Sequence, residues 1–408
     1  MTSGIASFLL SLRRKASLPN DVIYLKGSTK RICQLTGEID RERGTPAFNR
    51  TETKWGLIGT DLGASFDAGT HTYFLFGDTF PKNPDSTYRP SAGDSIAYTT
   101  DASPELGITL NFFTAPDGHN YRSPSVPGVS LGPFEVPTGG FSVGPDNYIF
   151  FTTGHTDTVV MGHAVLAETK DFTTFTKVYD LPELSPHNKT PLINVSPWVV
   201  DNSFVPGLPE NTGYGVLLFG SGEYRHSNPY LAYVPRWSVR DKSTIVYYAG
   251  LSGNTPRWER NMPDKAAPLF IHPVIGELSV TYNKFLRRWI MLYNSGDPAK
   301  PYIICRVAEK PWGPWSDGET IFNPCTDNGF CHFMHLASVP HNPCTNVAPC
   351  PEKHLYDPNR ISINGGVYGP YQISRYAKAA PNGTTIYWVM STWNPYNTML
   401  MKSTLVTA

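Results

Sequence analysis

Three acidic residues stand inside apolar, strand-like stretches of this 408-residue chain. Asp61 lies in GTDLG, Asp78 in FLFGDTF and Glu277 in GELSVTY. Burying an unpaired carboxylate is costly, so each of these acids needs a partner or a task. Paired carboxyl groups beside a cavity can hydrolyse a glycosidic bond: a protonated one assists the leaving oxygen, and an ionised one activates water or attacks the anomeric carbon. The structural alternative is that each acid binds nearby backbone amides or an arginine.

Other side chains near predicted strand ends could contact a ligand. His155, in TTGHTD, could hydrogen-bond a substrate hydroxyl or a catalytic acid, although a structural histidine is the commoner outcome. Asp201, in VVDNS, is a weaker fourth acid. The segment SGEYRHSNPY places Glu223, Arg225 and His226 in either a sugar-binding loop or an ion-paired turn. The aromatic side chains that could stack on sugar rings, or pack between blades instead, are Trp198, Tyr371, Trp393 and Tyr396.

The sequence predicts no metal and no cofactor. His332 and His335, in CHFMH, have a spacing that could bind a metal, but the adjacent Cys331 is expected in a disulfide, which disfavours a ligand role. No G-x-S-x-G, Walker or dinucleotide-binding pattern is present, so a serine nucleophile and nucleotide chemistry have no support.

The elements that must position these residues are β-strands. The chain contains 35 Gly and 37 Pro, which disfavour long helices, and 13% of its residues are aromatic. The 34 basic residues balance 34 acidic ones, and no basic block occurs, so neither nucleic acid nor an acidic membrane is an expected partner. No run approaches the roughly 18 apolar residues of a membrane span.

A degenerate repeat predicts the fold. Five apolar segments each end in small or polar residues, and each has a strand-like segment before it and another after it. These central segments are YFLFGDT (73–79), YIFFTTG (148–154), GVLLFGSG (215–222), WIMLYNSG (289–296) and IYWVMST (386–392). Five antiparallel meanders predict an all-β, five-bladed β-propeller. The first strand of each blade would line the central channel, which brings the acids of blades 1 and 4 to one cavity.

We expect a single propeller domain over residues 21–408, preceded by a flexible N-terminal extension, residues 1–20. The last unit lacks an outer strand, which the segment VIYLKGS (22–28) could supply, closing the ring and removing an exposed edge. The cysteine-rich insert, residues 323–360, would form loops over one face.

The cysteines and sequons favour a secreted protein. Two short loops are bracketed by cysteines, which predicts the local disulfides Cys325–Cys331 and Cys344–Cys350 and leaves Cys33 and Cys305 able to pair with each other. The N-terminus is a poor signal peptide, because its basic residues follow the apolar stretch. Four sequons fit a glycosylated protein: Asn49, Asn188, Asn194 and Asn382.

The motifs GTDLG and FLFGDTF, with GELSVTYN…RWIMLYNSG and YGPYQISRY…STWNPYNTMLMKS downstream, resemble the family called domain of unknown function 4185, which is associated with glycoside hydrolase family 183. The resemblance implies a five-bladed propeller enzyme, an endo-D-arabinanase that cuts the α-linked D-arabinofuranose chains of mycobacterial arabinogalactan and lipoarabinomannan. It also implies that Asp61 and Asp78 are the catalytic pair of an inverting mechanism. Glu277 is similar to the inner-strand acids of other five-bladed furanosidases, which act on L-arabinan or fructan.

Two functions therefore compete. One is a secreted, endo-acting glycoside hydrolase with a furanose polysaccharide as substrate, and the other is a non-catalytic propeller that binds carbohydrate. Lectin-type propellers usually carry near-identical blades, whereas here the blades diverge and the acids concentrate in blades 1 and 4. This favours one catalytic site, and inversion predicts carboxyl groups about 6.5–9.5 Å apart.

Overall fold

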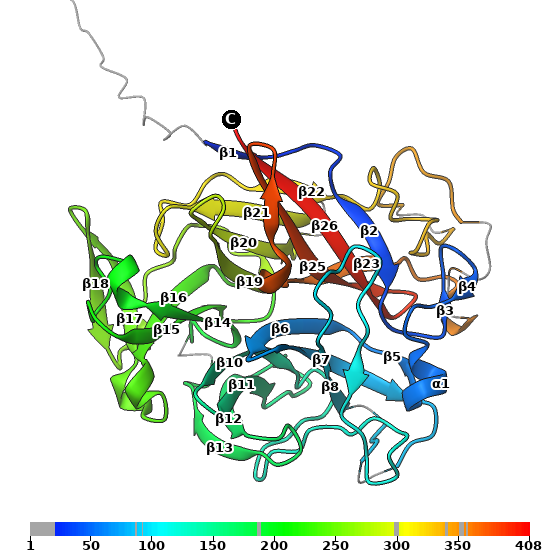
Figure 1. Ribbon diagram of the computed structural model, residues 1–408, viewed down its shortest axis with the longest axis horizontal. Coiled ribbons are helices and arrows are strands. Elements are labelled where there is room, and N and C mark those ends of the chain that lie inside the picture. Colours follow the sequence, from blue (N-terminus) through cyan, green and yellow to red (C-terminus); the bar gives the residue numbers. More distant parts are fainter. Residues whose placement is uncertain are drawn as a thin grey trace, which may run out of the picture.

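The computed structural model describes residues 21–85, 88–91, 93–185, 189–297, 302–338, 342–350, 355 and 358–408. The expected N-terminal extension (1–20) and the sequon at Asn188 lie outside the described residues. The strands form five antiparallel sheets around a central channel, so the fold is the predicted five-bladed β-propeller (Figure 1).

Each blade is a meander whose first long strand lies innermost. Blade 1 contains β5 (Leu57–Gly59), β6 (Leu62–Ala68), β7 (His71–Pro81), β8 (Gly93–Thr99) and β9 (Asn111–Phe112). Blade 2 contains β10 (Pro137–Val143), β11 (Asp146–Thr153), β12 (His163–Thr169) and β13 (Thr176–Asp180). Blade 3 contains β14 (Asn194–Asp201), β15 (Tyr214–Ser221), β16 (Pro229–Pro235), β17 (Val246–Ser252) and β18 (Thr255–Arg260).

The remaining two blades complete the ring. Blade 4 contains β19 (Ile275–Asn283), β20 (Arg288–Ser295), β21 (Ile303–Ala308) and β22 (Glu319–Phe322). Blade 5 contains β23 (Gly366–Gln372), β24 (Lys378–Ala380), β25 (Gly383–Trp393), β26 (Asn397–Thr407), β1 (Val22–Tyr24) and β2 (Lys30–Gln34). A small hairpin, β3 (Ile39–Asp40) and β4 (Thr45–Pro46), precedes the helix α1 (Thr51–Trp55). Short 3-10 helices lie at Asn202–Phe204 (η1), Arg236–Ser238 (η2), Lys242–Thr244 (η3), Pro263–Lys265 (η4), Pro358–Arg360 (η6) and Ser374–Tyr376 (η7).

The N-terminal segment pairs with the last blade, as its sequence led us to expect. In the antiparallel ladder between β1 and β26, Val22 pairs with Thr407 and Tyr24 pairs with Leu405, while β2 pairs with β26 further along. Strands from both ends of the chain therefore share blade 5. The pairing covers the edge that β26 would otherwise expose.

The central strands are apolar because a propeller blade is covered on both faces. In β11 every residue after Asp146 is buried, and in β7 Phe74, Leu75 and Phe76 are all fully buried. Runs of this kind suit strands packed between two neighbouring sheets. Side-chain hydroxyls join neighbouring inner strands: Val280 N donates to Ser196 Oγ at 3.0 Å, and Ser279 Oγ donates to the carbonyl oxygen of Pro370 at 2.7 Å.

The predicted disulfide pairing is wrong. The bonds are Cys325–Cys344 and Cys331–Cys350, each joining residues 19 positions apart. The two cysteine-bracketed loops lie against each other, so each cysteine meets a partner in the other loop. This contact is also evident from Cys325 Sγ, which lies 3.6 Å from the carbonyl oxygen of Pro343.

Cys33 and Cys305 do not pair with each other; both are free and buried. Cys33 packs in the hydrophobic cluster between blades 1 and 5, whereas Cys305 packs in the cluster between blades 4 and 5. Their placement in different cores explains why the expected bond is absent.

Two of the four sequons are buried and cannot carry a glycan in the folded protein. Asn49 is 1% exposed, and its amide nitrogen donates to the carbonyl oxygens of Leu35 and Ile108. Asn194 is buried at the start of β14, whereas Asn382 is exposed in the turn before β25.

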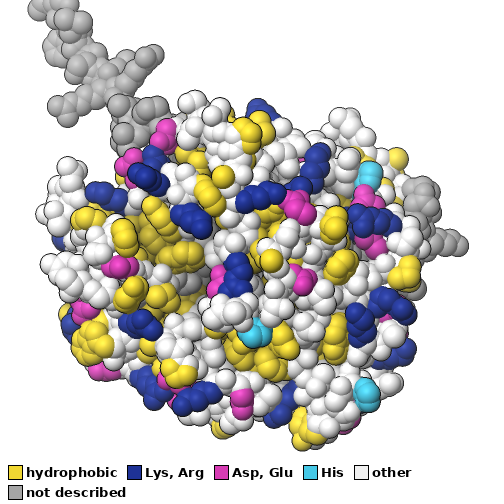
Figure 2. Space-filling view, viewed as in Figure 1, with side chains coloured by type: hydrophobic (Ala, Val, Ile, Leu, Met, Phe, Trp, Pro, Cys, Tyr) yellow, Lys and Arg dark blue, Asp and Glu magenta, His cyan; other side chains and the backbone are white. Residues whose placement is uncertain are grey.

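Figure 2 shows basic, acidic and hydrophobic side chains interspersed over the face that it presents, in keeping with a formal net charge of zero. Among the described residues, no helix has the length and the apolar character needed to cross a bilayer.

Candidate active site

The beginnings of the inner strands meet at one mouth of the channel and bring acids together. Asp61 immediately precedes β6, Glu135 lies just before β10, and Glu277 is near the start of β19. Burial is the largest cause of the raised pKa of Asp61, and the charges of Asp78 and Glu277 raise it further. Asp61, Asp78 and Glu277 therefore share one electrostatic environment. The structure thus brings together all three acids that the sequence singled out as catalytic candidates.

A bend in the chain follows Asp61, and Gly63 permits it. Leu62 and Gly63 both have positive φ angles, 58° and 92°, and the pairing of β6 with β7 shifts register between Leu62 and Ala64. A non-glycine residue in this region of φ is uncommon and stores strain. Leu62 N donates to Ser391 Oγ at 2.7 Å, which anchors the bend to blade 5.

The Asp61 carboxyl is buried and held by tyrosine hydroxyls. It is 8% exposed, and Oδ2 accepts a hydrogen bond of 3.0 Å from the hydroxyl of Tyr368, while the hydroxyl of Tyr396 lies near enough to lower the pKa. Burial, followed by the charge of Asp78, raises the pKa of Asp61 to about 8 despite these hydrogen bonds. Asp61 is therefore protonated at neutral pH.

Asp78 lies on the adjacent strand, β7, and is half-buried. Both of its oxygens accept from Phe134 N, at 3.1 and 3.3 Å. Phe134 has a φ of 62°, and its ring lies 5.0 Å from the ring of His155. Burial raises the pKa of Asp78 to about 6, although the Phe134 hydrogen bond and His155 oppose the shift. Asp78 is therefore ionised at neutral pH, unlike Asp61.

Asp94 is an additional buried acid that the sequence reasoning missed. It lies on β8, beside the strand that carries Asp78, and is 1% exposed. Neither carboxyl oxygen has a hydrogen-bond partner among the described residues. Burial, and then the charges of Asp78 and Asp61, raise the pKa of Asp94 well above its ordinary value. Asp94 therefore adds a further buried carboxyl to the cluster.

Glu135 is a second acid that was missed, and its hydrogen bonds shape the loop around Asp78. Its carboxylate accepts from Ser130 Oγ, from Gly132 N at 2.7 Å and from His155 N at 3.0 Å. These hydrogen bonds outweigh burial and lower the pKa of Glu135. Glu135 thereby holds the backbone of His155, which is near enough to Asp78 to lower the pKa of that acid.

Glu277 is tied to the loop that was predicted to form a rim. Tyr224 donates its hydroxyl to Oε1 at 3.3 Å, and the Arg225 guanidinium lies at the same distance in a largely buried ion pair. Arg225 also lies over the rings of Tyr224 and Tyr368, at 4.8 and 5.7 Å. Glu223 itself is exposed at this rim. The loop is thus a partner of Glu277 as well as an exposed edge of the site.

The expected role of Asp201 as a fourth acid of the site is corrected, because the structure does not place Asp201 with the other acids. It ends β14, at the opposite end of the strand from Asn194, and its carboxylate accepts from Ser203 N at 3.0 Å as the cap of η1. Capping of η1 explains this acid without any ligand.

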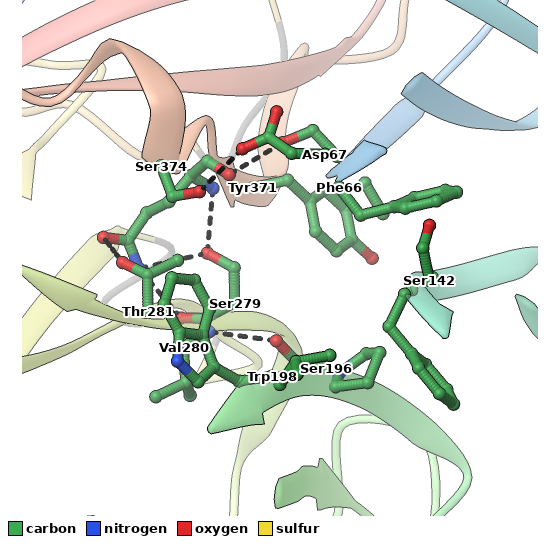
Figure 3. A pocket seen from close by; sticks show the side chains of 18 of the residues that line it. Phe66, Asp67, Ser142, Ser196, Trp198, Ser279, Val280, Thr281, Tyr371 and Ser374 are labelled. Atoms are coloured by element: carbon green, nitrogen blue, oxygen red, sulfur yellow. Dashed lines mark hydrogen bonds between the residues drawn. The ribbon is translucent and has the colours of Figure 1, made fainter. Parts of the chain in front are cut away.

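Tyr371 and Trp198 belong to the other half of the channel. They line a cavity of about 300 Å³ whose walls come from all five inner strands (Figure 3). Tyr371 is 3% exposed, and its hydroxyl extends into this cavity rather than toward the rim (Figure 3). The pKa of Tyr371 is raised by burial and by the charges of Glu277 and Asp61, so the ring lies between the cavity and the acids.

Trp393 lies at the acid-bearing face but its ring is partly covered. The Arg360 guanidinium lies 3.9 Å from the ring centre, and the Tyr396 ring stands perpendicular to it at 5.8 Å. Tyr396, rather than Trp393, is the residue that reaches Asp61.

The residues that the sequence reasoning missed are Asp94, Glu135, Tyr224 and Tyr368. Asp94 carried a usable signal, since it stands at the start of an apolar strand as Asp61 does. The tyrosines carried none, because aromatic residues are abundant in every blade.

The arrangement can perform acid–base chemistry. A neutral carboxyl at Asp61 can give a proton while an ionised carboxyl at Asp78 can accept one, because their surroundings hold their pKa values apart. Within the described residues, no group of three or more histidines, cysteines or acids has a geometry that would hold a metal ion.

These features define a β-propeller with one carboxyl cluster at a mouth of its channel. The chain belongs to the family described as domain of unknown function (DUF4185), whose model matches residues 46–402. This agrees with the family that the sequence motifs resemble. The comparison with curated proteins gives no significant match.

Several solved structures are similar to this chain. An exo-β-1,3-galactanase from Phanerochaete chrysosporium has 9% identity and a TM-score of 0.45, covering 92% of this chain and 64% of the galactanase, so the chain spans less than two thirds of that protein. A native arabinanase from Bacillus subtilis has 11% identity and a TM-score of 0.41, covering 86% of this chain and 96% of the arabinanase. An exo-1,5-α-L-arabinanase from a bovine ruminal metagenomic library has 10% identity and a TM-score of 0.43, covering 85% of this chain and 94% of the other.

Proposed function

We propose that this protein is a secreted glycoside hydrolase that cuts furanose polysaccharide within the chain, by inversion, at the Asp61–Asp78 pair. The observation that carries the proposal is the contrast between these two neighbouring acids. Asp61 has a pKa of about 8 and Asp78 a pKa of about 6, both raised by burial. Perturbed carboxyl groups in a cavity are typical of catalytic sites, where an acid and a base must coexist near neutral pH.

In the proposed reaction, Asp61 is the general acid and Asp78 the general base. Asp61 gives its proton to the glycosidic oxygen as the bond from that oxygen to the anomeric carbon breaks. A water molecule attacks the anomeric carbon from the opposite face, and Asp78 takes a proton from this water. Exchange with solvent then restores a proton on Asp61 and removes one from Asp78.

Neighbouring groups hold both acids in the states that this reaction needs. The Tyr368 hydroxyl orients Asp61. The Phe134 amide holds Asp78, with His155 close enough to influence its pKa. We assign His155 a second role as a donor to a substrate hydroxyl, since its ring lies beside exposed Phe134 at the mouth of the site.

Glu277 is assigned an electrostatic and positioning role in this proposal. Glu277 pairs with Arg225, and its charge contributes to the raised pKa of Asp61. Asp94 adds a further carboxyl to the same environment.

The substrate we propose is the D-arabinan of arabinogalactan or lipoarabinomannan type. Family membership supports this choice through the resemblance of the GTDLG and FLFGDTF motifs. A net charge of zero suits an uncharged polysaccharide. Secretion is supported by two disulfides, which persist in oxidising compartments.

The main alternative is a propeller that binds carbohydrate without cleaving it. Burying the two carboxyl groups with raised pKa values, and a further acid without a partner, destabilises the fold. A protein that only binds carbohydrate gains nothing from this cost. A furanosidase acting on L-arabinan or fructan is the second alternative, since the acid pair itself does not select the sugar.

Release of reducing ends from D-arabinan, L-arabinan, arabinogalactan and fructan tests the proposal. We expect release from the D-arabinan substrates, with oligosaccharides of several lengths as early products. Binding to these polysaccharides without any release would contradict the proposed hydrolase and support the lectin-type alternative.

A further inference from the structure

A groove beside the acids lies between blades 1 and 5. Its volume is about 530 Å³, within the roughly 300–1,000 Å³ usual for ligand pockets. Its walls come from α1, from the turn between β25 and β26, from η6, and from the hairpin that begins at β3. Ile58, Phe80, Arg360 and Tyr396 are among the residues that line it.

The groove is continuous with the acid pair. Tyr396 lines the groove and is also near enough to Asp61 to influence the pKa of that acid. Phe80 follows Asp78 by two residues on β7, where burial alternates: Asp78 and Phe80 are accessible, whereas Thr79 and Pro81 are buried. Because side chains two residues apart on a strand share a face, the Phe80 ring extends the surface that presents Asp78.

The chemistry of the groove fits an uncharged sugar chain. Phe80 is 38% exposed and Ile58 is 49% exposed, and the Phe80 and Tyr396 rings meet edge to face at 5.4 Å. Apolar rings of this kind pack against the C–H faces of sugars. Arg360 has no carboxylate partner among the described residues and presents N–H donors to the groove.

The acidic residues in the groove are already neutralised. Glu38 pairs with Arg50 at 2.9 Å, and Glu52 pairs with Lys82 at 2.9 Å. Arg360 therefore remains as a cationic donor in the groove, and its guanidinium N–H groups can hydrogen-bond the hydroxyl groups of an uncharged sugar.

A second accessible aromatic surface lies on the other side of the acids. Phe134 is 43% exposed and stacks near His155, and it approaches Asp78 from the blade 2 side. Tyr396 approaches Asp61 from the blade 5 side. Since blade 1 stands between blades 5 and 2, the acid pair lies between the two surfaces.

We propose that the Phe80–Tyr396 groove binds several consecutive furanose residues of the polysaccharide on one side of the bond that is cut. This inference rests on the proposed function and adds the path that the polysaccharide takes across the protein. The Phe134–His155 surface receives the first residue on the other side. The hairpin residues Glu38, Ile39 and Arg41 form one wall of this groove.

The test compares linear arabinofuranose oligosaccharides of about four and about eight residues. Binding energy from remote parts of a substrate raises turnover only when the enzyme contacts those parts. For the wild type, kcat/KM should be higher for the longer oligosaccharide. Phe80→Ala should lower the ratio of kcat/KM for the longer to the shorter substrate by about 2- to 10-fold, the usual worth of one aromatic contact.

Arg360→Ala serves as an independent variant, because Arg360 lies on η6, away from the strand that carries Asp78. It should lower the same ratio. Phe204→Ala is the matched control: this ring is 81% exposed and lies in η1, at the opposite end of the channel, so the ratio should equal that of the wild type.

An unchanged ratio in both groove variants, with an active wild type, would overturn the groove assignment and leave the proposed hydrolase standing. If the wild type releases no reducing ends from any polysaccharide or oligosaccharide, the proposed function fails and the groove assignment fails with it. The two failures are therefore distinguishable.

Discussion

A Cβ atom on Gly77 would lie 2.5 Å from Oδ1 of Asp61. Gly77 precedes Asp78 in the FGDT motif, and its amide donates to the carbonyl oxygen of Asp61 at 3.1 Å. The glycine thus leaves the space that the buried carboxyl occupies and links the two strands that carry the acid pair.

Gly77→Ala should displace the Asp61 carboxyl and reduce turnover by about 10²-fold, because small misplacements of a catalytic group are costly. The same Cβ would also meet Leu62 Cδ1 at 2.9 Å, so a moderate loss of thermal stability should accompany the loss of activity. Gly366→Ala is the control, since a Cβ there meets nothing within 4 Å. Full activity in Gly77→Ala would show that the carboxyl position is unimportant.

The rate should depend on pH through both acids. Asp78 must be ionised, so kcat/KM should rise as pH increases through about 6. Asp61 must be protonated, so kcat/KM should fall as pH increases through about 8. A profile of kcat/KM from pH 4 to pH 10 measures both limbs. In Asp61→Asn the residual activity should lose the alkaline limb, whereas an unaltered limb would assign it to another group.

The raised pKa of Asp61 also predicts a stability change. Between pH about 3.8 and about 8, native Asp61 keeps a proton that the unfolded chain has released. The native state then binds more protons, so the free energy of unfolding decreases as pH rises through this window. Asp61→Asn removes this penalty. Its Tm should exceed that of the wild type at pH 8, and the difference should shrink toward pH 4; a Tm below that of the wild type at pH 8 would contradict the account.

Glu277→Gln distinguishes the positioning role from a catalytic one. Loss of the negative charge leaves Arg225 without its partner, so thermal stability should fall, and turnover should fall less than in Asp78→Asn. Kinetics and thermal unfolding of the two variants, measured side by side, check this order. If Glu277→Gln abolishes activity and Asp78→Asn does not, Glu277 is the partner acid of Asp61.

Peptide mapping under non-reducing conditions should recover the links Cys325–Cys344 and Cys331–Cys350. Thiol titration should detect Cys33 and Cys305 only after unfolding, because both are buried. Four or more thiols in the unfolded, unreduced protein would contradict these bonds.

The fold could be predicted from the sequence because its signal is repeated. Apolar strands such as 148–154 and 289–296 recur in all five blades, and a missing outer strand at one end of the chain matched an unpaired segment at the other. Asp61 and Asp78 could be found for a related reason: an acid within an apolar strand is conspicuous against its neighbours.

The rest depended on contacts between segments far apart in the chain. Tyr368 bonds Asp61 across 307 positions, and Phe134 bonds Asp78 across 56, and neither spacing leaves a local pattern. The disulfide pairing failed for the same reason, since four cysteines allow three connectivities and spacing does not choose among them. Asp201 was misassigned because the sequence pattern of an acid at a strand end is the same whether the acid caps a turn or faces a cavity.

The most direct test of the central claim is the initial rate of reducing-end release from D-arabinan by the wild type, Asp61→Asn and Asp78→Asn at neutral pH. We predict that each substitution lowers the rate by about 10²- to 10⁴-fold, the usual contribution of a positioned acid or base, while circular dichroism shows an intact β-fold. Near wild-type rates in both variants would contradict the claim that this pair of acids performs the reaction.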